Sequence, residues 1–183
     1  MIGSPAVVEA PRTTGHRGRV LVPVLCVGAF LAVGVSTWLV LDERLREAGI
    51  AAAVAGALLV VAGLTLPSEG ARRERMLLSF ADRAFDGAIL GSLAWVTRLS
   101  EPATAAGALL ALAAGFLAAY IRARGAALGY LIEEGAGTRA IRCGLIALSL
   151  IAGWTAWAVY VVAIWMLLVS AIRASQVAKE ERA

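Results

Sequence analysis

Long apolar stretches alternate with short charged segments along most of the chain. A helix that spans a bilayer needs about 20 consecutive, mainly apolar residues, and the first four stretches have about that length. The fifth is too long for one span. Within it, Gly153 followed by Trp154 and Trp157 predicts a tight turn at a membrane interface that divides the stretch in two. The pattern therefore predicts six transmembrane helices, in these segments: Val20–Leu41, Ala48–Leu66, Met76–Val96, Ala103–Ile121 and Ile141–Ile172.

The composition is typical of a membrane protein. Hydrophobic residues make up 60% and charged residues 16% of the 183 residues, whereas about a quarter of a soluble domain is charged. The mean hydropathy is +0.80. The first apolar stretch is too long for the apolar region of a secretory signal, and no small-residue cleavage site follows it. We therefore expect an all-α, polytopic membrane protein. Cys26 and Cys143 both lie in apolar stretches and are predicted to be buried thiols.

The basic residues are distributed unevenly over the two sides that six spans define. Thirteen of the 17 fall on the side of the two termini and three on the opposite side, while Arg83 lies within the third predicted helix. Because Lys and Arg are enriched in cytoplasmic segments, this asymmetry predicts that both termini are cytoplasmic. The abundance of Arg, Ala, Val and Gly suggests a bacterial protein, and hence the bacterial inner membrane. The isoelectric point near 9.7 is explained by this topology, so we expect no nucleic-acid partner.

The sequence divides into three predicted segments. Residues 1–18 are polar and contain Pro, Thr and Gly, so we expect a disordered cytoplasmic tail. Residues 19–175 form the predicted six-helix transmembrane domain, and residues 176–183 form a second cytoplasmic tail. The single histidine, His16, lies in the first tail, which excludes a histidine-based metal site or catalytic triad in the bundle.

The segment SFADRAFDG, residues 79–87, places charge inside the third predicted helix. Asp82 and Asp86 are four residues apart and share one helix face, and Arg83 can reach Asp86 or a neighbouring helix. Ionisable groups inside a membrane normally face the bundle interior or a water-filled cavity. One interpretation is a structural ion pair, which we favour from the residues alone. The other is a site for a divalent metal or an anionic headgroup, although two carboxylates alone make a poor metal site.

Three segments of the chain resemble a known family. The run LLSFADRAFDGAILGSLAWV resembles the third helix of CDP-alcohol phosphatidyltransferases, especially the phosphatidylinositol-phosphate synthase branch, which has an LDSxxDRxxDG-like run there. GFLAAYIRARGAALG resembles the family's SYxRARAExLG, and residues 137–142, GTRAIR, resemble the basic start of its fifth helix. The similarity covers about Leu77 to Arg142. The resemblance implies a six-helix bundle with a cytoplasm-facing site that transfers a phosphatidyl group from a CDP-linked lipid.

The sequence departs from the motif D-x2-D-G-x2-A-R-x8-G-x3-D-x3-D, whose four aspartates bind two metal ions in the family. With Asp82 as the last aspartate, the third falls on Leu78 and the first two fall on Ala57 and Val60. With Asp82 and Asp86 as the last two, no aspartate lies at the upstream positions either. Half of the metal site is therefore missing. Asp82 remains as a residual catalytic position, and Asp82 with Asp86 would bind Mg²⁺ or Mn²⁺ only in an active variant. We otherwise expect no cofactor.

Four arginines near the ends of the fourth and fifth predicted helices are the candidate phosphate-binding residues. In the inositol-phosphate branch, arginines of this region receive the phosphate of the acceptor, and the guanidinium fork suits phosphate because it can bind two oxygens at once. The alternative is that they reflect topology or contact lipid headgroups. The four are Arg122, Arg124, Arg139 and Arg142.

These observations lead to one expected function and two alternatives. We expect a catalytically degenerate, transferase-like membrane protein that acts as a partner, regulator or lipid- or phosphate-binding paralogue, in contact with membrane lipids. It could form a homodimer or a heterodimer with an active transferase. The first alternative is a divergent, active transferase with a single metal at Asp82, Asp86 and either Glu69 or Glu74. The second is an unrelated small transporter or scaffold in which the charged segment is a relay.

Overall fold

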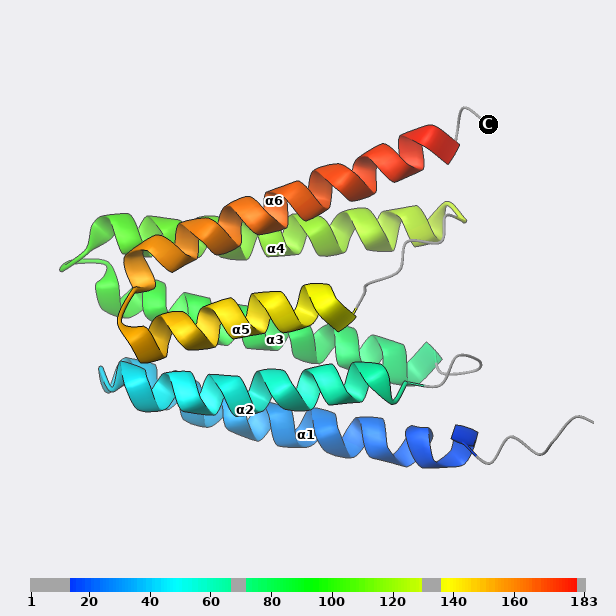
Figure 1. The fold of residues 1–183 in the computed structure, drawn as a ribbon, viewed down its shortest axis with the longest axis horizontal. Coiled ribbons are helices and arrows are strands. Elements are labelled where there is room, and N and C mark those ends of the chain that lie inside the picture. Colours follow the sequence, from blue (N-terminus) through cyan, green and yellow to red (C-terminus); the bar gives the residue numbers. More distant parts are fainter. Residues whose placement is uncertain (1–13, 67–71, 130–135, 181–183) are drawn as a thin grey trace, which may run out of the picture.

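A computed structural model describes residues 14–66, 72–129 and 136–180 (Figure 1). These residues form six α-helices and no strand. The helices are α1 (Thr14–Leu41), α2 (Leu45–Leu64), α3 (Arg72–Thr97), α4 (Pro102–Ala127), α5 (Ala136–Ala152) and α6 (Thr155–Glu180).

The helical order follows the prediction closely. The last apolar stretch divides where expected, because α5 ends at Ala152 and Gly153 adopts a φ of +73°, a left-handed conformation that glycine accepts without strain. The structure differs more from the prediction at the two predicted tails. α1 begins at Thr14, inside the segment 1–18, and α6 continues to Glu180, inside the segment 176–183. Residues 1–13 and 181–183 lie outside the described residues.

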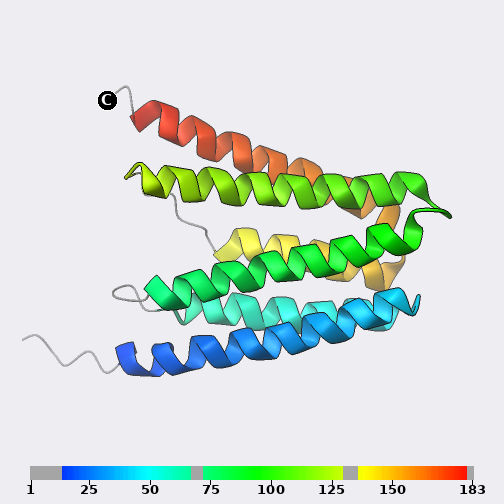
Figure 2. The same cartoon turned by 180° about the vertical axis from the view of Figure 1, so that it is seen from behind.

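The six helices run alternately up and down, so the first and last described residues lie at the same end of the bundle (Figures 1 and 2). We call this the termini end. α3 lies between α1 and α4, whereas α2 packs against α1 and α5. α6 packs mainly on α4 and meets α5 near their shared hairpin. α5 and α6 then diverge toward the termini end.

Small residues allow α2 and α5 to pack closely. A Cβ atom added at Gly49 would lie 2.8 Å from the carbonyl oxygen of Ala147, and one added at Gly56 would lie 2.7 Å from the Cβ of Cys143. Both glycines therefore leave space that backbone or near-backbone atoms of α5 occupy. Close helix approach through small residues is typical of membrane bundles, where apolar side chains gain little by leaving lipid.

Four of the six helices are long and apolar enough to cross a membrane by length and composition: α1, α2, α4 and α6. α3 is long enough, but Asp82, Arg83 and Asp86 interrupt its apolar part. α5 has only 17 residues. The chain thus has several apolar helices compatible with an integral membrane protein, and six spans stays a prediction. The α3 charges do not argue against a span, because both carboxylates are buried between helices rather than exposed on the outer face.

Tryptophan marks the end of the bundle opposite the termini end. Trp38 and Trp95 lie near the last residues of α1 and α3, and Trp154 and Trp157 lie at the α5–α6 hairpin. All four are exposed. Exposed tryptophans at one level are typical of a membrane interface, where the ring contacts the headgroup region.

Candidate functional site

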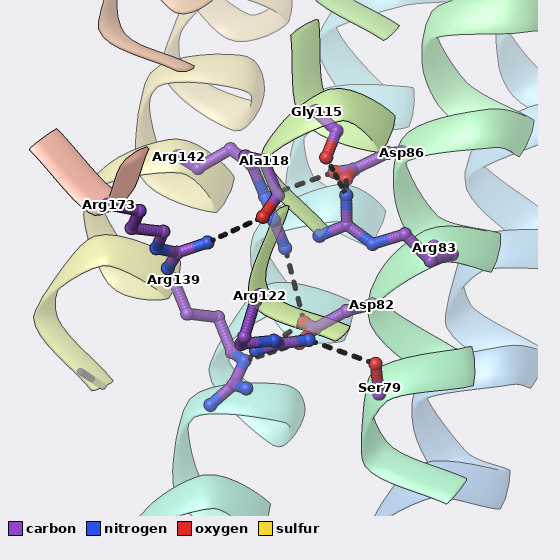
Figure 3. A network of polar contacts seen from close by, with 10 residues as sticks. All are labelled: Ser79, Asp82, Arg83, Asp86, Gly115, Ala118, Arg122, Arg139, Arg142 and Arg173. Carbon is purple, nitrogen blue, oxygen red and sulfur yellow. Dashed lines mark hydrogen bonds and ion pairs between the residues drawn. The ribbon is translucent and has the colours of Figure 1, made fainter. Parts of the chain in front are cut away.

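Seven charged side chains of the described residues lie close together inside the bundle (Figure 3). Their positions along the helices place most of them in the half nearer the termini end. We call them the charge cluster. Two are the aspartates of α3, Asp82 and Asp86, which lie one helical turn apart and are 0% and 2% exposed. The other five are arginines from four different helices: Arg83, Arg122, Arg139, Arg142 and Arg173.

Asp82 is bound by two arginines of α5. The Nε atom of Arg139 lies 2.9 Å from Oδ1 and 2.8 Å from Oδ2 of the carboxylate. Arg142 donates from Nη2 to Oδ1 over 3.2 Å. The sequence grouped these two arginines among the phosphate-binding candidates; in the structure both contact Asp82, and phosphate binding by them stays a prediction.

Asp86 is held by ion pairs of looser geometry. Its Oδ1 atom lies 3.1 Å from Nε of Arg142, and its Oδ2 atom lies 3.2 Å from Nη1 of Arg83. Neither oxygen has a well-aligned hydrogen bond. Arg83 also donates to the carbonyl oxygen of Gly115 on α4, over 2.7 Å. Arg83 therefore makes both contacts that its sequence position allowed, to Asp86 and to a neighbouring helix.

The arginines of α5 reach across a wide space to α3. No α-carbon of α3 lies within 8 Å of one of α5 in the described residues, so side chains alone connect the two helices. Gly63 of α2 contributes to this arrangement, because a Cβ atom added there would clash with Nη1 of Arg139. The guanidinium of Arg139 thus occupies the space that any larger residue at position 63 would need.

Arg122 and Arg124 of α4 have different environments, although the sequence placed both among the four candidate phosphate-binding residues. Arg122 points inward and donates from Nη2 to the hydroxyl of Ser79 over 3.0 Å. Arg124 is exposed. Two residues correspond to about 200° around a helix, so both side chains cannot face the same interior. The structure therefore brings Arg122 into the charge cluster and leaves Arg124 outside it.

Arg173 of α6 belongs to the cluster, although sequence reasoning counted it only among the basic residues of the cytoplasmic side. It is 6% exposed and donates from Nη1 to the carbonyl oxygen of Ala118 over 3.1 Å. A signal was present, because Arg173 follows Met166 and Ser170 at helical spacing and all three are buried. A basic residue on the buried stripe of an apolar helix belongs to the interior.

The cluster carries an excess of positive charge. Among the described residues, five guanidinium groups face two carboxylates, a formal excess of three charges, and Arg122 and Arg139 have further partners besides these. α4 contains no acidic residue, and the only one in α6 is Glu180, its last position. Among the described residues, no carboxylate lies within ion-pair distance of Arg173. Buried charge of one sign is unfavourable unless a counter-charge is supplied.

The residues do not fit the pair of divalent metal ions that the family resemblance implies. Both remaining carboxylates are already paired with guanidinium groups. α2 has no acidic residue after Glu47, which lies at the opposite end of the bundle, so no register supplies the upstream aspartates. Leu78, in the place of the third aspartate, is buried. Among the described residues, no three His, Cys, Asp or Glu side chains gather where they could hold a metal ion.

The positions of Glu69 and Glu74, the alternative metal ligands, do not support a single-metal site either. Glu74 lies in the first turn of α3, eight residues before Asp82, and Glu69 lies outside the described residues. The two cysteines are both free and buried, as predicted.

Comparison with models of known protein families and with curated proteins finds no match. The resemblance to CDP-alcohol phosphatidyltransferases therefore rests on the three segments described above.

Proposed function

We propose that this protein is a membrane-embedded binding protein for phosphate-bearing anions, with a transferase-like bundle that has lost phosphatidyl transfer. The observation that carries the proposal is the excess of guanidinium groups over carboxylates among the described residues of the charge cluster, three of whose five arginines are buried. A phosphate monoester or a lipid phosphate headgroup would supply the negative charge that the cluster lacks.

Arginine suits this role for geometric as well as electrostatic reasons. Its planar fork binds phosphate oxygens in pairs, and charge-assisted hydrogen bonds are about twice as strong as neutral ones. Arg122 and Arg173 are the best candidates for direct contact with the anion. Both reach the cluster from α4 and α6, whose described residues carry no carboxylate at this level; Arg173 donates to a backbone carbonyl, and the contacts of Arg122 include the hydroxyl of Ser79. An anion can replace such neutral acceptors at a gain in energy.

The same arrangement argues against catalysis. A carboxylate that accepts the proton of an attacking alcohol, or binds a metal, has to be available to it. Asp82 is instead fully buried and paired with Arg139 and Arg142. The positional equivalents of the other metal ligands, Ala57, Val60 and Leu78, cannot bind a cation. We therefore infer that the protein binds without transferring, and that in a cell it acts as a partner or regulator of an active transferase in the bacterial inner membrane.

Binding can be tested with two probes that carry the same chemistry. Purified protein in phosphatidylcholine nanodiscs is titrated with inorganic phosphate in one arm. In the other arm, phosphatidic acid is added to the nanodisc lipids and its retention is measured by native mass spectrometry. Saturable binding in either arm supports the proposal and tells a free anion from a headgroup. The absence of saturable binding in both arms refutes it.

The chain provides a matched control for this experiment. Arg122→Gln removes an inward guanidinium and should weaken binding about 10- to 100-fold, the equivalent of one charge-assisted hydrogen bond. Arg124→Gln changes the same residue type two positions later on the same helix, where the side chain is exposed. It should change affinity less than about twofold. Equal effects of the two variants would mean that general surface charge, rather than the cluster, binds the anion.

Loss of phosphatidyl transfer is tested separately. Protein is incubated with a CDP-linked lipid, Mg²⁺ or Mn²⁺ and either inositol phosphate or glycerol phosphate, and released CMP is measured. We expect no release above a protein-free control. CMP release that disappears in Asp82→Asn would overturn the inference of a binding protein and restore the active-transferase alternative.

A further inference from the structure

The hydrogen bonds around Asp86 are incomplete. Both of its carboxylate oxygens are buried and lie at ion-pair distance from Arg142 and Arg83, yet neither oxygen receives an aligned hydrogen bond. On the donor side, Nε and Nη1 of Arg142 and Nε of Arg83 are also buried and make no aligned hydrogen bond within the described residues. Asp82, by contrast, accepts hydrogen bonds at both oxygens. The unmet bonds are therefore concentrated around Asp86 rather than spread over the charge cluster.

The neighbouring protein groups do not supply the missing partners. The thiol of Cys143 is close to the Arg142 guanidinium, but sulfur is a weak acceptor. Nη1 of Arg83 already donates to the carbonyl oxygen of Gly115. Most buried polar atoms in proteins have a partner, which is either a protein group or ordered water. Unmet donors and unmet acceptors within one ion-pair network favour a small ligand that donates and accepts at the same time.

Gly115 of α4 leaves room for such a ligand beside Asp86 (Figure 3). Gly115 is buried, and an added Cβ atom would lie 3.6 Å from Oδ2 of Asp86 and 3.4 Å from Nη1 of Arg83. Outside the adjacent part of α4, it would meet no other described atom within 4 Å. A methyl group would thus make only ordinary contacts there. An oxygen atom that forms hydrogen bonds approaches its partners to about 2.5–3.2 Å, so a water molecule fits the same space.

We propose that a water molecule is bound between Asp86, Arg83 and Gly115 as an internal part of the charge cluster. It donates a hydrogen bond to Oδ2 of Asp86 and accepts one from an adjacent guanidinium N–H. Buried waters typically make about three such bonds to polar groups that are otherwise unpaired. Asp86 is then the hydrated carboxylate of the cluster, and Asp82 is the dry one. The water is independent of the proposed function, because Asp86 needs these bonds with or without a phosphate anion.

The chain has only three aspartates, so hydration can be measured at single carboxylates. Asp42 is exposed, whereas Asp82 and Asp86 are buried. In protein labelled with ¹³C-aspartate and reconstituted in lipid bilayers, water-edited solid-state NMR measures how fast water protons transfer polarisation to each carboxyl carbon. Only Asp86 is followed by glycine, so additional ¹⁵N-glycine identifies its signal without a mutation. ¹⁵N-arginine identifies the signal of Asp82 in the same way, because only Asp82 is followed by arginine.

The two buried carboxylates serve as sample and control within one spectrum. Burial alone predicts equally slow transfer to both, since Asp82 is 0% and Asp86 is 2% exposed and they lie one helical turn apart. A bound water predicts severalfold faster transfer to Asp86 than to Asp82. Transfer to Asp42 should be the fastest of the three, because bulk water reaches it.

Filling the space at Gly115 tests where the water lies. Gly115→Ala should lower the transfer rate of Asp86 to that of Asp82 and leave Asp42 unchanged. The added methyl group makes only ordinary contacts, so the fold should be retained. Gly91→Ala is the matched control, because no heavy atom lies within 4 Å of a Cβ atom added there. It should leave all three transfer rates unchanged.

Three results overturn the proposed water site. Equally slow transfer to Asp82 and Asp86 in the unaltered protein means that neither carboxylate is hydrated. Fast transfer to Asp86 that persists in Gly115→Ala means that the water lies elsewhere. Fast transfer to both buried carboxylates means that the whole cluster is wet. None of these results bears on phosphate binding, which is measured by its own titration, so the water site and the proposed function can fail separately.

Discussion

Replacing Gly63 by alanine tests how Arg139 is held against Asp82. The added Cβ atom would clash with Nη1 of Arg139, because it would lie well inside a comfortable carbon–nitrogen contact of about 3.5 Å. The nearest atom of any other residue is Cδ2 of Leu78, at 3.7 Å, which is an ordinary contact. The substitution should therefore displace the Arg139 guanidinium and disturb little else.

The expected loss of stability follows from the contacts that the displacement breaks. Nε of Arg139 lies 2.8 and 2.9 Å from the two oxygens of Asp82, and a hydrogen bond between charged groups contributes about 1.5–3 kcal/mol. Arg142 still neutralises Asp82, so the carboxylate is not left without a partner. Alanine within a helix is favoured over glycine by about 0.5–1 kcal/mol, which offsets part of the loss. We expect Gly63→Ala to lower the free energy of unfolding by about 0.5–2.5 kcal/mol.

Reversible unfolding in mixed micelles, followed by circular dichroism, measures this difference. Gly87→Ala and Gly91→Ala are the matched controls, because no heavy atom lies within 4 Å of a Cβ atom added at either position. They should be neutral or stabilising. The decisive comparison is a double-mutant cycle with Arg139→Gln, whose shorter side chain does not reach position 63. In that background Gly63→Ala should no longer destabilise. If it destabilises both backgrounds equally, the clash with Arg139 is not the cause and our reasoning about the cluster fails.

Three further predictions concern the interior. Asp82→Asn removes the counter-charge that Arg139 and Arg142 share and should lower the free energy of unfolding by about 3–5 kcal/mol. A decrease below about 1 kcal/mol would mean that these ion pairs do not stabilise the fold. Gly56→Ala should destabilise by about 1–3 kcal/mol, because its Cβ would lie 2.7 Å from that of Cys143, whereas Gly34→Ala meets nothing within 4 Å and should not. The Cys26 and Cys143 thiols are buried, so maleimide should label them only after unfolding; rapid labelling of the folded protein would contradict the packing around them.

The helices could be predicted from sequence because their signal is local. Each apolar run is long enough to define a helix, and the glycine that divides the last run adopts a positive φ, as a turn at that place requires. α3 and α4 both continue through charged residues beyond their apolar runs, so a hydropathy pattern underestimates the length of both helices. The beginning of α1 at Thr14 was missed for the same reason, since the polar residues before Val20 resemble a tail.

The members of the charge cluster were harder to predict, because they depend on which helices become neighbours. The sequence indicated that Asp82, Arg83 and Asp86 lie inside the bundle, and it offered an ion pair as one interpretation. It could not assign Arg139 and Arg142 to Asp82, since those residues are 57 and 60 positions apart from it. The position of Arg173 depends on helix rotation, and rotation is set by packing. A count of charges on each side of a membrane ignores rotation altogether.

The shortness of α5 has a consequence for the bilayer. Its 17 residues rise about 25 Å, whereas the 26 residues of α4 rise about 39 Å and the hydrocarbon layer is about 30 Å thick. A bilayer that all six helices cross has to be thinner beside α5, and such hydrophobic mismatch costs a fraction of a kcal/mol per Å. Local thinning brings headgroups and water down toward the first turn of α5, where Arg139 lies. Membrane thickness would therefore control access to the charge cluster, with short-chain lipids favouring entry of the anion and long-chain lipids opposing it.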